Sequence, residues 1–174
     1  MNDNSPQPQR VLVTGASGAI GTPVCRHLLA RGHHVRGLYH ICAAAVEAGV
    51  QRLALASSLQ VISGIKKEGT IHIEDGTAPN NHYALTKVWA EDIGEMYARV
   101  HDLSVILVRV GWFPRNTAEA LRLAGYQHGP SVYFSHTDAE RFFARCVESP
   151  TPAAGECATV FATSRPAATM RLDP

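Results

Sequence analysis

Residues 11–21 read Val-Leu-Val-Thr-Gly-Ala-Ser-Gly-Ala-Ile-Gly and join a short apolar run to a glycine-rich turn. An apolar run of this length is typical of a buried parallel strand. A helical pattern that carries Val24, Leu28 and Leu29 follows the turn. Strand, glycine-rich turn and helix in this order predict a site for the diphosphate of a dinucleotide, because the helix N-terminus supplies N–H donors and the positive end of a dipole. The alternative is a plain tight turn.

Three glycines would have separate roles in such a site. Gly15 permits the tight turn, and Gly18 lets the backbone approach the diphosphate. Gly21 allows the helix to pack closely on the strand.

The adenosine end of the site departs from the usual pattern. A dinucleotide site of this type normally has an acid about 20 residues past the glycines, which binds the ribose. This chain has no Asp or Glu between Asp3 and Glu47. Arg36, at the end of a predicted strand over residues 33–38, could meet a 2′-phosphate and favour NADP, although a solvent-facing arginine fits equally well. We therefore expect weak NAD binding, with any residual preference for NADP.

A second pattern occurs in the predicted helix over residues 80–101. Tyr83 and Lys87 stand four residues apart and so share one helix face. A tyrosine hydroxyl is a poor acid or base near neutral pH, and a lysine ammonium one turn away favours the tyrosinate. The pair alone is weak evidence, since a surface pair without function matches it equally well.

Buried strands are predicted over residues 52–56 and 104–109, with shorter strands over residues 132–134 and 158–161. Ser57 and Ser58 follow the first of these, where ligands bind in an open α/β sheet, although simple loop polarity explains them too. Further helices are predicted over residues 39–48, 116–124 and 137–147. Residues 59–81 read as a long loop with an extended piece at 71–73, and the chain after residue 161 reads as an irregular tail.

The composition excludes several classes of protein. The chain of 174 residues is predicted to be one domain with a flexible arm over residues 1–9, and its formal charge of +1 argues against a nucleic-acid or membrane-surface partner. No apolar run is long enough to cross a membrane and no signal peptide is evident, which favours the cytoplasm. The four cysteines are far apart and the nine histidines form no ligand cluster, so we expect neither disulfides nor a metal.

With these motifs placed, the chain resembles the extended short-chain dehydrogenase/reductases, the NAD-dependent epimerase/dehydratase group. The stretches VLVTGASGAIG, LALASS and HYALTKVWAE carry the resemblance. Within the group, GLYHICAAAVEAGVQR, LVRVG and YFSHTDAERF look most like uronate dehydrogenases. The resemblance implies an α/β fold, a shortened three-layer parallel-sheet NAD(P)-binding Rossmann-like domain. It implies hydride transfer between NAD or NADP and a sugar or uronic acid, and commonly a homodimer through the Tyr83 helix, with Trp89 as a candidate contact.

The resemblance also implies roles for single residues. Ser58 would hydrogen-bond the substrate, Tyr83 would be the acid/base, and Lys87 would lower the tyrosine pKa and bind the nicotinamide ribose. The cofactor would contact the following residues: Gly15, Ser17, Gly18, Ala19, Ile20, Gly21, Arg36, Ala56, Tyr83, Lys87 and Val110.

Two departures from the family stand out. The segment that normally carries an acid, a helix and two more strands is missing, as if deleted at Gly37-Leu38, and the chain stops before the part that usually closes over the sugar. Ser57-Ser58-Leu59-Gln60 stands where uronate dehydrogenases read Ser-Ser-Asn-His. Right-handed crossovers still permit one sheet ordered 33–38, 11–14, 52–56, 104–109.

Three hypotheses on function remain from the sequence. The first is an NAD(P)-dependent oxidoreductase or epimerase that acts on a sugar or uronic acid. The second is a catalytically weakened remnant that serves as a nucleotide-sensing or protein-interaction module. The third is an edited or incompletely represented version of a longer enzyme.

Overall fold

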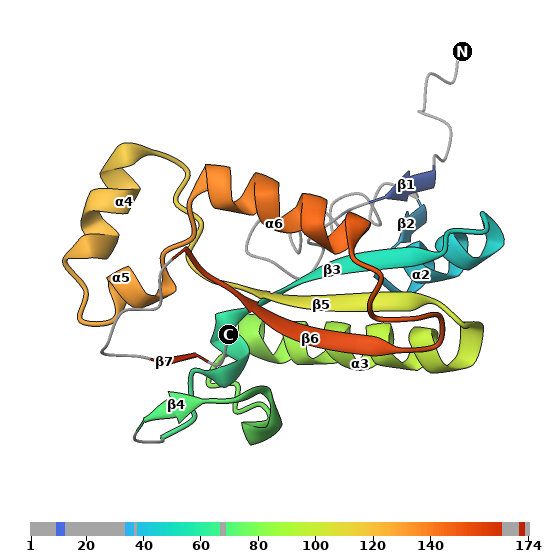
Figure 1. The fold of residues 1–174 in the computed structure, drawn as a ribbon, viewed down its shortest axis with the longest axis horizontal. Helices are drawn as coiled ribbons and strands as arrows, with labels where there is room; N and C mark the ends of the chain where they lie inside the picture. Colours follow the sequence, from blue (N-terminus) through green and yellow to red (C-terminus); the bar gives the residue numbers. More distant parts are fainter. Residues whose placement is uncertain (1–9, 13–33, 37, 67–68, 165–170, 173–174) are drawn as a thin grey trace, which may run out of the picture. The chain divides into compact units, whose positions relative to one another are not determined.

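The computed structural model describes residues 10–12, 34–36, 38–66, 69–164 and 171–172. They belong to two compact units, residues 1–49 and 50–174, which we describe separately. Figure 1 shows the ribbon with its elements labelled. The predicted glycine-rich turn and the helix after it lie outside the described residues. The single-domain prediction stays a prediction.

The first unit contains two parallel strands and a helix. Strand β1 (Arg10–Leu12) pairs with β2 (His34–Arg36), and Arg10 lies opposite His34. Helix α2 (Leu38–Glu47) follows, which confirms the helix expected over residues 39–48. The parallel pairing of β1 and β2 agrees with the predicted sheet order, whereas the pairing of β1 with the strand over residues 52–58 stays a prediction.

The second unit is built on a three-stranded parallel sheet. Strand β5 (Ser104–Val110) lies between β3 (Arg52–Ser58) and β6 (Cys157–Ala162). The register places Ser58 opposite Val110, so β3 and β5 end at the same edge of the sheet. Helix α3 (His82–His101) covers one face and α6 (His136–Glu148) the other, as Figure 1 shows. The strands predicted over residues 52–56, 104–109 and 158–161 and the predicted parallel α/β architecture are confirmed here.

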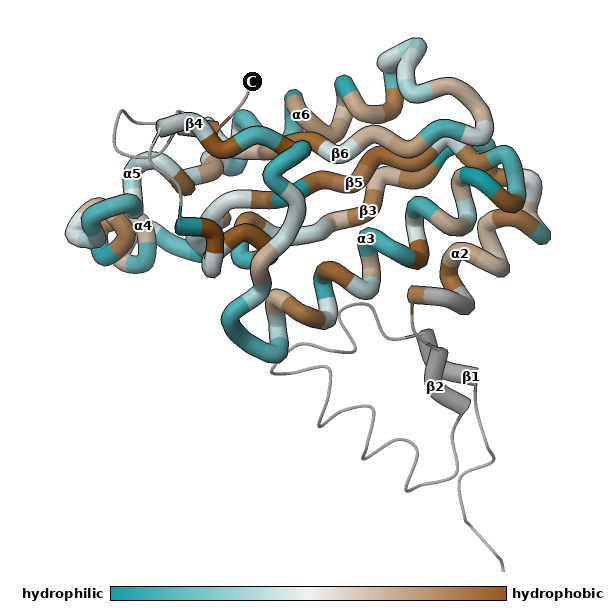
Figure 2. Tube along the Cα trace, turned by 90° about the horizontal axis from the view of Figure 1, so that it is seen from below, coloured by the Kyte–Doolittle hydropathy of each residue, from teal (hydrophilic) through white to brown (hydrophobic). Residues whose placement is uncertain are grey.

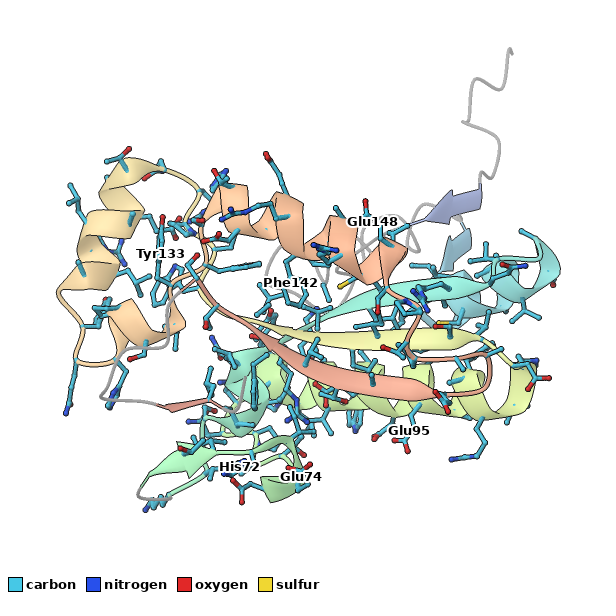
Figure 3. The ribbon with its side chains drawn as sticks, viewed as in Figure 1. His72, Glu74, Glu95, Tyr133, Phe142 and Glu148 are labelled. Atoms are coloured by element: carbon cyan, nitrogen blue, oxygen red, sulfur yellow. The ribbon has the colours of Figure 1, made fainter. Side chains whose placement is uncertain are left out.

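The alternation of side chains along β5 explains its continuous apolar sequence. Ile106 and Val108 pack with Phe134 and Cys146 on the α6 side, and Figure 3 shows Phe142 pointing from α6 towards the sheet. On the α3 side, Gly94 brings the helix close, because a Cβ at this position would lie 2.8 Å from a methyl group of Leu107. With both faces covered, all the strand's side chains except the last are buried, and the sheet is the brown centre of Figure 2.

Residues 111–135 differ from the sequence prediction. Helix α4 (Thr117–Ala124) is confirmed, but the strand predicted over residues 132–134 is wrong. A single helical turn, α5 (Gly129–Val132), replaces its start, with Pro130 in the first turn where proline is tolerated. Tyr133 makes only an isolated parallel bridge to Trp112. Proline fixes φ near its helical value, which favours the turn over a strand.

The loop between β3 and α3 contains more structure than expected. It carries a 3₁₀ turn at Leu59–Ile62, strand β4 (Thr70–Ile71) and a second 3₁₀ turn at Ile73–Asp75. The tail after residue 161 is not wholly irregular, because β7 (Arg171–Leu172) pairs in parallel with β4. In Figure 3, His72 and Glu74 lie on this small β4 region.

Two kinds of feature are absent from the described residues. No helix there is long and apolar enough to cross a membrane. No group of three or more His, Cys, Asp or Glu side chains there could hold a metal ion.

Candidate active site

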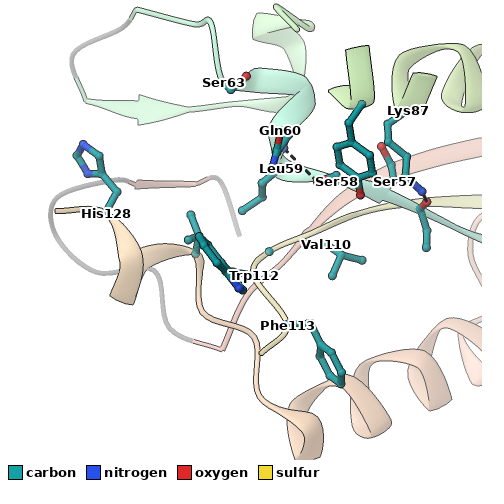
Figure 4. A pocket seen from close by; sticks show the side chains of 14 residues that line it. Ser57, Ser58, Leu59, Gln60, Ser63, Lys87, Val110, Trp112, Phe113 and His128 are labelled. Carbon is teal, nitrogen blue, oxygen red and sulfur yellow. Dashed lines mark hydrogen bonds between the residues drawn. The ribbon is translucent and has the colours of Figure 1, made fainter. Parts of the chain in front are cut away.

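A pocket of about 700 Å³ opens at the edge of the sheet where β3 and β5 end. Figure 4 shows it from close by. Ligands of open α/β sheets bind beyond the carboxyl ends of the strands, and pockets of this volume hold small molecules. It is lined by Ala56, Ser57, Ser58, Leu59, Gln60, Ser63, Tyr83, Lys87, Val110, Gly111, Trp112, Phe113, His128 and Val132.

Tyr83 reaches the pocket from the first turn of α3. Asn81 caps this helix, because its side-chain oxygen accepts a hydrogen bond of 2.9 Å from the N–H of Ala84. The other end of the same side chain donates to Gln60 at 2.9 Å, which ties the helix start to the loop after β3. Tyr83 itself is 40% exposed, so a ligand in the pocket can reach its ring.

Lys87 lies one turn further along α3 and borders the same pocket. Its Nζ donates a hydrogen bond of 2.7 Å to the carbonyl oxygen of Ala56 and lies 5.8 Å from the centre of the Tyr83 ring. Burial lowers the pKa of the Lys87 ammonium from its ordinary value. The spacing of four residues therefore does bring the two side chains together, on the face of α3 that meets the end of β3.

The two serines that end β3 have different partners. Ser57 is buried and donates to Glu91 Oε1 on α3. Ser58 Oγ accepts a hydrogen bond of 3.2 Å from the N–H of Gln60, which caps the 3₁₀ turn over residues 59–62. Both line the pocket, which lies at the end of the strand.

A buried ion pair between α3 and β5 supports the residues at the pocket. It was not predicted from the sequence. Glu91 lies one turn after Lys87 on α3 and pairs with Arg109 of β5 through bonds of 2.9 and 3.1 Å. Both side chains are at least 90% buried. The Glu91 carboxylate therefore connects α3 to β5 through Arg109 and to β3 through Ser57. Arg109, a charge inside an otherwise apolar strand, is the signal that could have found it.

The opposite wall of the pocket is aromatic and was also missed. Trp112 and Phe113 follow β5 directly, and both are labelled in Figure 4 together with His128. The backbone of Trp112 is held on both sides, because its C=O accepts from Phe134 N–H at 2.9 Å and its N–H donates to Val132. The Phe113 ring stacks on His136 with 4.2 Å between ring centres. The signal was present in the sequence, since these aromatic residues come directly after a buried strand.

The predicted cofactor residues divide into two groups. Ala56, Tyr83, Lys87 and Val110 line the pocket with Ser58. Arg36 lies in β2, and nothing is described of its side chain. The remaining residues of the predicted set lie outside the described part of the chain: Gly15, Ser17, Gly18, Ala19, Ile20 and Gly21.

Comparison with known protein families shows to which family the chain belongs. Residues 11–41 and 34–112 match the model of the NAD dependent epimerase/dehydratase family, which together cover more than half of the chain. The chain belongs to this family. The two matched segments meet at residues 34–41, where the sequence analysis locates the missing segment.

Two relatives with named activities are similar over about two thirds of the chain. An NAD-dependent glucose-6-phosphate dehydrogenase of Haloferax volcanii is 29% identical over 67% of this chain and 48% of its own length. A uronate dehydrogenase of Pseudomonas syringae pv. tomato is 28% identical over 68% of this chain and 41% of its own length. The chain thus spans about half the length of the curated relatives it matches.

Solved structures agree on the fold. The uronate dehydrogenase of Agrobacterium tumefaciens superposes with a TM-score of 0.66 at 18% identity, covering 95% of this chain and 80% of that one. A mutated uronate dehydrogenase gives a TM-score of 0.64 at 19% identity, covering 95% of this chain and 77% of that one. These likenesses confirm the predicted Rossmann-like fold.

Proposed function

We propose that the chain is an NAD(P)-dependent oxidoreductase that acts on a sugar or sugar acid through Ser58, Tyr83 and Lys87. The observation that carries the proposal is that these three residues line one pocket at the carboxyl ends of β3 and β5. Membership of an NAD-dependent family supports it, and so do the dehydrogenase names of its relatives.

The pocket residues fit the nicotinamide half of such a cofactor. The Lys87 ammonium is fixed at the pocket by the Ala56 carbonyl, where it can donate to ribose hydroxyls with its remaining N–H groups. The Tyr83 ring is open to the pocket, and Val110 supplies an apolar surface at the strand end. The diphosphate would fall on Gly15, Gly18 and Gly21, as expected from the sequence.

The side chains have complementary proton roles in this proposal. When bound, the nicotinamide ring supplies the hydride-accepting chemistry. The Tyr83 hydroxyl, as tyrosinate, takes the proton of the substrate hydroxyl group whose carbon is oxidised. Ser58 Oγ holds the same substrate oxygen by a hydrogen bond. The Lys87 ammonium, close to the Tyr83 ring, stabilises the tyrosinate.

A second candidate is a weakened remnant that binds nucleotide without turnover. It is favoured by the lack of any Asp or Glu between Asp3 and Glu47, which leaves no acid for the adenosine ribose.

The homodimer and the cytoplasmic location also stay predictions. Trp89, 57% exposed on α3, is the residue we would test for the dimer.

One pair of measurements separates the two candidates. The melting temperature is recorded with NAD and with NADP, since a ligand at a hundred times its Kd adds about 2.7 kcal/mol to stability. The absorbance of the reduced nicotinamide is then followed with a panel of aldoses and uronic acids. A thermal shift with turnover supports the oxidoreductase, and a shift without turnover on any sugar supports the remnant. No shift with either cofactor contradicts the oxidoreductase and the nucleotide-sensing remnant, and favours a protein-interaction module.

A further inference from the structure

The indole of Trp112 forms a fixed aromatic wall of the pocket. Its ring stacks against Tyr126, with 5.9 Å between ring centres and 24° between planes. The indole also hydrogen-bonds the carboxylate of Glu119, whose pKa is lowered chiefly by its hydrogen bonds with Arg115 and less by the bond with Trp112. Trp112 lines the pocket and Tyr126 does not. The part of the indole that faces the pocket is therefore not covered by the Tyr126 ring. Trp112 is 36% exposed, and its contacts with Tyr126 and Glu119 fix the orientation of the indole.

The charges around this wall do not suit an anion. Among the described residues that line the pocket, Lys87 is the only lysine or arginine, and its ammonium is bound to the Ala56 carbonyl. Arg115, the next cation along the chain, is bound to the Glu119 carboxylate by three hydrogen bonds of 2.7–3.3 Å. Glu119 in turn accepts from Trp112, so the ionised group that touches the aromatic wall is an acid.

A carboxylate in this pocket would have neutral hydrogen-bond donors but no free cation, so the loss of its hydration would be only partly compensated. An uncharged sugar ring meets no such penalty. Its C–H face is apolar and can lie on the negative face of an indole, while its hydroxyl groups remain free for polar partners. Gln60, Ser63 and His128 supply such partners around the same pocket.

We infer that Trp112 is a specificity-determining residue that stacks against the ring of an uncharged sugar, so that the site prefers a neutral aldose over a uronate or a sugar phosphate. This inference rests on the proposed function for the position of the site and narrows its substrate class.

The matched probes are D-galactose and D-galacturonate, which differ only at C6. The chain has two tryptophans, so Trp89→Phe leaves Trp112 as the only indole reporter. In this background at pH 8, D-galactose should change the Trp112 fluorescence in a saturable way. D-galacturonate should bind at least about tenfold more weakly. Both titrations are made with and without NAD.

Two substitutions then test the stacking itself, with sugar binding followed by saturation-transfer NMR. Trp112→Ala should weaken D-galactose binding about tenfold, and Trp112→Phe should keep it within about threefold, because an aromatic face is retained. Circular dichroism of each variant checks that the fold is intact.

The outcomes separate this inference from the proposed function. Tighter binding of D-galacturonate overturns the inference, as does an unchanged affinity in Trp112→Ala or a lack of binding by both sugars. Turnover on the uronate alone keeps the oxidoreductase and removes the neutral-sugar preference. Saturable D-galactose binding without turnover on any sugar keeps the inference and removes the oxidoreductase.

Discussion

At the scale of single residues, the buried pair of Glu91 and Arg109 holds the site together. The Glu91 carboxylate receives hydrogen bonds from Arg109 and Ser57, and it lies one helical turn after Lys87. Removing one partner of a buried ion pair leaves an uncompensated charge in the core, which costs about 3–5 kcal/mol. A pair exposed to solvent contributes about 0–1 kcal/mol.

The first prediction follows from this difference. Arg109→Met should lower the free energy of unfolding by about 3–5 kcal/mol, measured by urea denaturation. Arg115→Met is the control, because Arg115 belongs to an ion pair and is 81% exposed, and its loss should cost at most about 1 kcal/mol. Equal losses in the two variants would show that Glu91 is not left uncompensated in the core. The double variant Glu91→Met/Arg109→Met should recover part of the loss.

At the scale of elements, helix α6 illustrates how a terminus is fixed. Ser135 caps it, because the Ser135 hydroxyl accepts from the Asp138 N–H at 3.1 Å. The Asp138 carboxylate accepts hydrogen bonds from Ser164, Ser135 and Arg141. Together these bonds lower the pKa of Asp138 to about 2. The start of α6 is thereby attached to the segment that follows β6.

The second prediction concerns the stability of the fold at low pH. A carboxyl whose pKa is lower in the folded state stabilises the fold above its unfolded pKa, near 3.9, and loses that effect as pH falls towards the folded value. The parent should therefore be more stable than Asp138→Asn at pH 5, and the difference should shrink between pH 4 and pH 2. Urea denaturation across this range measures it. Glu140→Gln, an exposed carboxylate on the same helix, is the control. A constant difference down to pH 2.5 would contradict the assigned hydrogen bonds.

The elements also show what the sequence can predict. Strand β5 was predictable because a continuous apolar run of this length needs burial on both faces, and β5 is buried up to its last residue. Strand β3 was predictable from the same pattern, although only Ser57 and Ser58 of this strand are fully buried. Turn α5 and strand β7 were not, because each has only a few residues and depends on a partner distant in sequence. β7 forms only against β4, and Tyr133 meets Trp112 only through the fold.

The candidate site divides in the same way. Tyr83 and Lys87 could be placed on one face from their spacing alone. Trp112 could have been assigned to the pocket from its place just after β5, whereas His128 could not, because α4 and the turn α5 bring this part of the chain back to the pocket. The network of Ser57, Glu91 and Arg109 joins three elements. The sequence shows only that Arg109 is a charge in an apolar strand, and it does not show which residues Arg109 contacts.

At the scale of the whole molecule, the proposed chemistry centres on Tyr83. The chain belongs to an NAD-dependent family and keeps Ser58, Tyr83 and Lys87 around one pocket, although it spans about half the length of its curated relatives. We expect weak cofactor binding, because no Asp or Glu lies between Asp3 and Glu47 to bind the adenosine ribose. Each hydrogen bond to such a charged group would contribute about 1.5–3 kcal/mol. Our proposal concerns the proton transfer to Tyr83 once the cofactor is bound.

The most direct test replaces the Tyr83 hydroxyl and nothing else. Turnover and NAD affinity are measured for the parent, for Tyr83→Phe and for Tyr97→Phe, whose hydroxyl lies on the same helix in a residue that does not line the pocket. At saturating NAD and sugar, we predict that Tyr83→Phe lowers kcat at least about a hundredfold, with the Kd for NAD within about twofold of the parent. Tyr97→Phe should keep the parent's kcat. A Tyr83→Phe variant with the parent's kcat, or a parent that binds NAD and oxidises no sugar, would contradict the account.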